Sequence, residues 1–73
     1  MEQRQIDNIF MYHKPEGTQL ERYLVLRETA KILATSINKL CPESREKALA
    51  LTNLQQAVMW ANAAIAINEV PTP

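Results

Sequence analysis

Several residue types are scarce in this 73-residue chain, and each scarcity argues against a class of function. The single glycine leaves no room for a glycine-rich phosphate loop. One cysteine excludes an intramolecular disulfide framework and fits a reducing compartment. Together with one histidine it falls short of a zinc ligand set, so we expect no metal or cofactor. Eight Lys and Arg balance eight Asp and Glu, so the chain lacks the cationic excess that general DNA or RNA binding needs.

Signals for export or membrane insertion are also missing from the sequence. Residues 1–6 are mostly polar and charged, which argues against a signal peptide. The longest nearly apolar stretch, residues 57–67, is interrupted by Asn62 and is much shorter than the about 20 residues of a bilayer span. We therefore expect a cytoplasmic protein that does not associate with membranes.

The residues that are present indicate one folded, helical domain. A hydrophobic content of 47% argues against disorder, and the length allows at most one domain, over residues 1–73. Near the N-terminus, Ile6, Ile9 and Phe10 recur with the i, i+3, i+4 spacing of a short helix. Pro15 and Gly17 then favour a loop.

Two long helices are predicted to follow, over residues 18–40 and 42–68. The first begins with Thr18 and Glu21, which have the spacing of a capping box. The second begins with Pro42, because proline is favoured at the first helical position. Apolar residues recur about every third or fourth position in the first helix, at Leu20, Leu24, Ala30, Leu33, Ile37 and Leu40. A heptad-like seam runs along the second, at Leu51, Leu54, Val58, Ala61 and Ile65.

Two helices that are joined by a very short connection form an antiparallel hairpin. The predicted fold class is therefore all-α, a short N-terminal helix plus a long helical hairpin, with residues 70–73 as a short tail. Two helices bury one stripe each against the other, yet the second long helix has further apolar positions. These are Ala50, Ala57 and Ala64, spaced by seven, and Leu49, Trp60, Ala63 and Ile67.

This surplus of apolar surface predicts an obligate homo-oligomer, because each large apolar side chain left in water forfeits about 1.5–3 kcal/mol. A complex with a different protein is the alternative. Five amides interrupt the apolar surface of the second long helix: Asn53, Gln55, Gln56, Asn62 and Asn68. They either lie on exposed faces, with one or two buried to set the register between subunits, or bond to a polar ligand between subunits.

No group of residues in the sequence has the local arrangement of a known catalytic motif. Cys41 lies at the junction of the two long helices, where a small buried residue is the simplest interpretation. His13 lies in the loop, where local packing or capping is the simplest interpretation. We therefore predict that the protein is not an enzyme.

Several residues of the sequence are instead suited to bind an anion. Arg27 and Lys31 stand at i, i+4 on one helix and repel each other unless an anion lies between them, although Glu28 can pair with Lys31 on a solvated face. Thr29 adds a hydroxyl nearby. Tyr12 offers a ring that either stacks on a base or covers the end of the hairpin. Across a twofold axis, one Arg per subunit becomes two, which suits a compact ligand with two phosphates.

Two parts of the sequence resemble a known family. In the N-terminal half these are residues 9–15 (IFMYHKP), 22–23 (RY) and 30–34 (AKILA), and in the C-terminal half residues 41–47 (CPESREK) and 49–66 (LALTNLQQAVMWANAAIA). Over residues 6–69 the chain resembles the phage anti-CBASS type 2 proteins, cyclic-nucleotide sponges that share the Acb–Tad hairpin domain. The resemblance implies a helical hairpin that assembles into compact hexamers in the cytoplasm of the infected bacterial host.

The resemblance also implies a ligand and a mechanism. Members bind cyclic dinucleotides such as 3′,3′-cyclic GMP-AMP (3′,3′-cGAMP) without cleaving them, so that the CBASS effector stays off. Tyr12 matches the tyrosine that stacks on a base, Arg27 falls where a cation meets a phosphate, and Thr29 matches a threonine near the phosphates. His13, beside the stacking tyrosine, is a further candidate, and Lys31 joins the set as the partner of Arg27.

Two related ligand classes and one other function stay open from the sequence. Some members also hold cyclic trinucleotides through an Arg near the end of the last helix, where this chain has Ile67 and Asn68 instead. Some hairpin relatives are sponges for the cyclic ADP-ribose signals of the Thoeris system, which need the same stacking and phosphate contacts. The third possibility is a helical adaptor protein with no small ligand.

Overall fold

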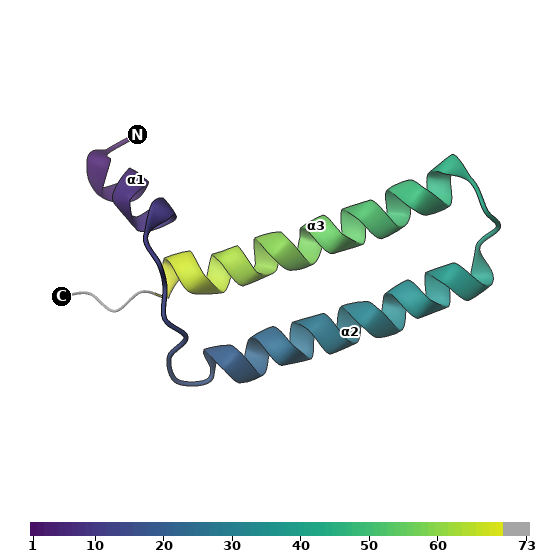
Figure 1. Cartoon of the computed structure of the whole chain (residues 1–73), viewed down its shortest axis with the longest axis horizontal. Helices are drawn as coiled ribbons and strands as arrows, with labels where there is room; N and C mark the ends of the chain where they lie inside the picture. Colours follow the sequence, from purple (N-terminus) through teal and green to yellow (C-terminus); the bar gives the residue numbers. More distant parts are fainter. Residues whose placement is uncertain (70–73) are drawn as a thin grey trace.

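The protein is described here by a computed structural model that covers residues 1–69. It contains three helices, α1 (Gln3–Phe10), α2 (Gln19–Leu40) and α3 (Arg45–Asn68), and no strand within that range (Figure 1). α2 and α3 run antiparallel, and α1 lies beyond the C-terminal end of α3. The all-α prediction and the helical hairpin are therefore confirmed. Within residues 1–69, every helix falls short of the combined length and apolar content that a membrane span requires.

The hairpin is held together by one stripe from each helix. Along α3 the half-buried stripe is the predicted heptad seam, Leu51, Leu54, Val58, Ala61 and Ile65. Along α2 it consists of Tyr23, Leu26, Ala30, Ala34 and Ile37. Both stripes follow a spacing of three or four residues, which keeps them on one face of each helix.

Only part of the apolar stripe predicted for α2 packs against α3. Ala30 and Ile37 face α3, but the four leucines of that stripe, Leu20, Leu24, Leu33 and Leu40, are exposed. The reason is that α2 carries apolar residues around most of its circumference, so periodicity alone does not select a face. The face that packs contains Ala30 and Ala34, whose small side chains let the two helices approach closely.

The predicted start of the second long helix was wrong by three residues. α3 begins at Arg45, with Ser44 as its N-cap: the Ser44 hydroxyl accepts from the Lys47 backbone N–H at 3.1 Å and donates to the Pro42 carbonyl at 3.0 Å. A serine side chain satisfies an otherwise unpaired helix N–H, which Pro42 has no means of doing. Cys41, expected to be buried, is exposed in this connection.

The predicted capping box at the start of α2 is also not formed. Thr18 is the N-cap residue, but its side chain makes no capping hydrogen bond and instead accepts from the Arg22 Nε at 3.1 Å. Gly17 has φ +56°, the left-handed conformation that glycine adopts without strain. The turn expected at Pro15 and Gly17 is therefore present, and α2 begins at Gln19.

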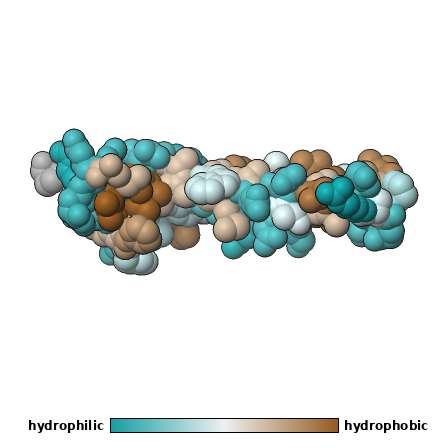
Figure 2. Space-filling model, turned by 90° about the horizontal axis from the view of Figure 1, so that it is seen from above, coloured by the Kyte–Doolittle hydropathy of each residue, from teal (hydrophilic) through white to brown (hydrophobic). Residues whose placement is uncertain are grey.

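A single copy of the chain has no hydrophobic core. Among residues 1–69 no hydrophobic side chain is buried, and the molecule is 13 Å thick in its shortest dimension, close to the diameter of one helix. Trp60 is 74% exposed, and apolar side chains lie open among polar ones where α1 and α3 are seen from above (Figure 2). A single layer of two helices has no interior in which these apolar side chains could be buried.

Candidate ligand-binding site

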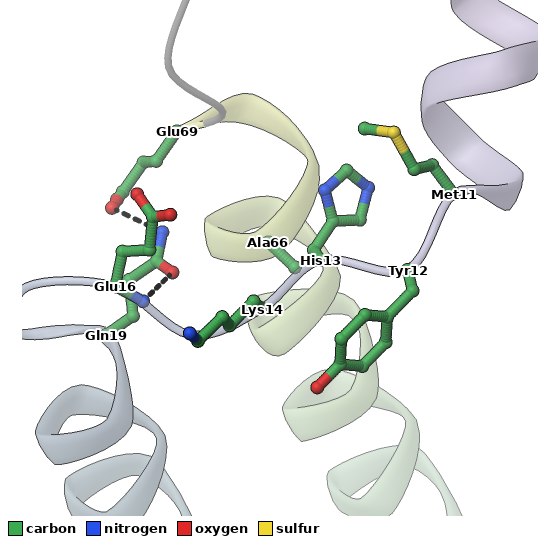
Figure 3. A pocket seen from close by; sticks show the side chains of 8 residues that line it. All are labelled: Met11, Tyr12, His13, Lys14, Glu16, Gln19, Ala66 and Glu69. Atoms are coloured by element: carbon green, nitrogen blue, oxygen red, sulfur yellow. Dashed lines mark hydrogen bonds between the residues drawn. The ribbon is translucent and has the colours of Figure 1, made fainter.

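The connection between α1 and α2, residues 11–18, passes the C-terminal end of α3 (Figure 1). There it forms an open cavity of about 230 Å³. Its lining comes from the connection, the first residue of α2 and the last turn of α3 (Figure 3): Met11, Tyr12, His13, Lys14, Glu16, Gln19, Ala66 and Glu69. Whole-ligand pockets usually measure about 300–1,000 Å³, so this volume suits one base better than an entire cyclic dinucleotide.

Tyr12 and His13 share this cavity, but their rings lie on opposite sides of the connection (Figure 3). Tyr12 is 83% exposed, so its ring is free to stack on a planar group. His13 is half-buried, and its Nε2–H donates to the Asn8 main-chain oxygen at 2.7 Å. This contact agrees with the local packing role considered for His13, and its ligand role stays a prediction.

The far end of the connection is held by polar contacts to α2 and α3. Gln19 is 8% exposed, which is unusual for an amide. Its side-chain oxygen accepts from the Glu16 backbone N–H at 3.0 Å, and its nitrogen donates to Glu69 at 3.4 Å. The Arg22 guanidinium donates two hydrogen bonds to the same Glu69 carboxylate, of 2.8 and 2.5 Å. This cluster could not be predicted from the sequence, because Arg22 and Glu69 are 47 residues apart.

The ion pair shifts the pKa values of both partners. The Arg22 hydrogen bonds lower the pKa of the Glu69 carboxyl from 4.5 to about 2, and the hydrogen bond to Glu69 raises the pKa of Arg22. Since both side chains are about two-fifths exposed, solvent screens the pair, and its effect on stability is small. The pair nevertheless joins the first turn of α2 to the end of α3 at the edge of the cavity.

Glu69→Gln is expected to reduce stability near neutral pH and to have little effect on it at about pH 2. Between about pH 4.5 and pH 2, the unfolded chain binds a proton at Glu69 that the folded chain does not, so acid removes the contribution of the ion pair. Urea unfolding midpoints of wild type and variant, measured from about pH 6 down to pH 2, test this. The gap between them should close with falling pH, and a gap that stays constant would contradict the assignment.

Arg27 and Lys31 lie together on α2, away from the cavity at Tyr12. Both are exposed and line a groove of about 350 Å³ between α2 and α3, whose floor is almost entirely apolar. Among residues 1–69 neither cation takes part in an ion pair, so the pairing of Lys31 with Glu28 does not form. Thr29 is exposed and lines neither this groove nor the cavity at Tyr12.

The candidate residues thus form two separate groups within a single chain. Tyr12 and His13 lie at the end of the hairpin, and Arg27 and Lys31 lie along its side. Gln19, the nearest part of α2 to the cavity, and Arg27 are eight residues apart, about 12 Å along the helix axis. One chain alone therefore presents an aromatic ring and a pair of cations in different places.

The structure defines a small helical-hairpin protein with an exposed aromatic ring in an open cavity at one end. Residues 2–66 match the family described as Acb2/Tad1, hairpin domain, and the chain belongs to this family. The resemblance seen in the sequence is thereby confirmed. Membership fits a phage anti-CBASS sponge in general, a role of sequestering ligands and not that of a known enzyme family. No curated protein and no solved structure matches the chain.

Proposed function

We propose that this chain is a homo-oligomeric phage protein that binds cyclic dinucleotides, such as 3′,3′-cGAMP, and withholds them from the CBASS effector of the infected host. It holds the messenger in the host cytoplasm without cleaving it. The observation that carries the proposal is the open Tyr12 ring at a base-sized cavity, in a member of the Acb2/Tad1 hairpin family.

Two copies of the chain supply the complete site. Tyr12 of each copy stacks on one base, and Arg27 of each copy binds one phosphate through its two-pronged guanidinium. Lys31 adds positive charge beside Arg27, and the Thr29 hydroxyl bonds to a phosphate oxygen. The separation of the two groups within one protomer supports this arrangement, because a second copy brings a ring close to cations that its own chain keeps apart.

The assembly that brings the copies together is a compact homo-oligomer, which we propose to be a hexamer. The absence of a buried apolar side chain among residues 1–69 supports self-association. The amide of Asn62 adds a second argument, since its Oδ1 is buried without a partner among these residues and can accept a bond across an interface or from a ligand. The other four amides of the second long helix are exposed.

Calorimetry with 3′,3′-cGAMP, followed by protease digestion and analysis of the released nucleotide, tests the proposal. We expect heat of binding and recovery of intact 3′,3′-cGAMP. No heat, or a degraded nucleotide, counts against it. Native mass spectrometry of the same sample tests the oligomer, and a different protein found in the complex in place of a nucleotide supports the adaptor alternative.

The same titration with other ligands defines the specificity. Cyclic ADP-ribose signals share the base and phosphate chemistry. Tight binding of these signals alone would show that the protein is a sponge for cyclic ADP-ribose signals and not for cyclic dinucleotides. We expect cyclic trinucleotides to bind less tightly than cyclic dinucleotides. Ile67 and Asn68 occupy the end of α3, and Asn68 Nδ2 donates back to the Ala64 carbonyl at 3.0 Å, so neither offers a cation to a phosphate.

A further inference from the structure

We infer that Asn8 and His13 are positioning residues: together they hold the connection that carries Tyr12 in place for stacking. The inference rests on the proposed function, because it concerns how Tyr12 meets a base. It assigns His13 a role through its contact with the protein instead of through contact with the ligand.

Asn8 joins α1 to the end of α3. Its side-chain Nδ2 donates to the Ile67 carbonyl at 3.0 Å, although the two residues are 59 positions apart. The last four carbonyls of a helix have no partner within the helix, so Asn8 satisfies a group that α3 leaves open. The contact therefore sets where α1 lies relative to the hairpin.

His13 extends this link to the residue next to Tyr12. Its ring donates to the main-chain oxygen of Asn8, the residue whose side chain is bound to α3. The backbone from residue 8 to residue 13 is thus closed into a loop by one hydrogen bond and docked on α3 by another. Tyr12 lies inside this closed segment.

The other side of Tyr12 is held by Gln19. This buried amide binds the Glu16 backbone N–H and the Glu69 carboxylate, so the connection is attached to α3 at both ends. The Tyr12 side chain itself makes no hydrogen bond among residues 1–69 and is largely exposed. Its position is therefore set by the backbone, and the backbone is set by these contacts.

Preorganisation of this kind strengthens binding, because a loose segment must be ordered when the ligand binds. Releasing the constraint on a few residues is expected to weaken binding of 3′,3′-cGAMP by about 10- to 100-fold. The effect should be smaller than that of removing the Tyr12 ring, since the ring remains available. It should also be accompanied by faster backbone hydrogen exchange in the ligand-free protein.

The test compares Asn8→Ala, His13→Ala and His13→Gln with wild type. Gln3→Ala is the matched control, since it removes an exposed α1 hydrogen bond to Asp7 without touching α3. Backbone hydrogen exchange of residues 8–18, which include the hydrogen-bonded amides at the end of α1 and those of Met11 and Glu16, is measured without ligand. Affinity for 3′,3′-cGAMP is measured by calorimetry. We expect both alanine variants to exchange faster and bind about 10- to 100-fold more weakly. His13→Gln should recover most of both properties, because a glutamine amide can donate to the Asn8 oxygen.

Three results overturn the inference. One is faster exchange with unchanged affinity, and another is unchanged exchange in both alanine variants. The third is weak binding by His13→Gln with normal exchange, which would place His13 in contact with the ligand. If Asn8→Ala fails to fold, the comparison of His13→Ala with His13→Gln decides whether the inference holds. If wild type binds no cyclic nucleotide, the proposed function fails, while the exchange data still report whether these contacts order the connection.

Discussion

Replacing Tyr12 with alanine is expected to weaken binding of 3′,3′-cGAMP by a factor of about 30 to 10⁴ without changing the mass of the oligomer. Stacking of one base on an aromatic ring contributes about 1–3 kcal/mol, and the proposed site uses two Tyr12 rings for each ligand. The sum, roughly 2–6 kcal/mol, converts to that range of affinity. The Tyr12 ring is mostly exposed in the protomer, so its loss leaves the hairpin packing intact. Calorimetry and native mass spectrometry provide the two measurements.

Tyr12→Phe is the matched control, since it keeps the stacking ring and removes only the hydroxyl, and it should bind nearly as wild type does. Arg27→Ala is the companion variant for the phosphate side and should likewise weaken binding strongly without changing the mass of the oligomer. Arg27→Lys keeps the charge but loses the two-pronged geometry, so we expect it to lie between Arg27→Ala and wild type. The site assignment is wrong if Tyr12→Ala and Arg27→Ala both bind with wild-type affinity.

Trp60→Glu is expected to break the oligomer into protomers and to unfold most of the chain at micromolar concentration. Trp60 is 74% exposed in one protomer, and burying a tryptophan removes about 150–250 Å² from water, roughly 4–6 kcal/mol at each interface position. A glutamate there loses this contribution and places a charge in an apolar contact. Because one protomer has no buried apolar side chain within residues 1–69, dissociation and unfolding should occur together.

Sedimentation analysis gives the mass, and circular dichroism gives the helix content of the same samples. Trp60→Phe keeps an aromatic side chain and should remain assembled and helical. Wild type that is monomeric and fully helical when diluted would contradict the requirement for assembly. Trp60→Glu that retains the wild-type mass would show instead that Trp60 lies outside the interface.

The sequence alone determined the helical elements, the seam of α3 and the family. Leu51, Leu54, Val58, Ala61 and Ile65 could be assigned to one face because a spacing of three and four residues is a local property of the chain. The long run of residues from 41 to 66 identified the family for the same reason, since it can be read in order. The start of α3 was not determined in this way, because the Ser44 side chain caps a helix that begins at Arg45, three residues after Pro42.

Only the tertiary structure decided which face of α2 packs and how the Tyr12 connection is held. Ala34 and Leu26 pack while Leu20 and Leu40 stay exposed, and that choice depends on the shape of the facing helix. The contacts from Asn8 to Ile67 and from Arg22 to Glu69 join residues that are 59 and 47 positions apart, and no periodicity connects them. Local patterns specify helices, whereas contacts between distant residues exist only after the chain has folded back on itself.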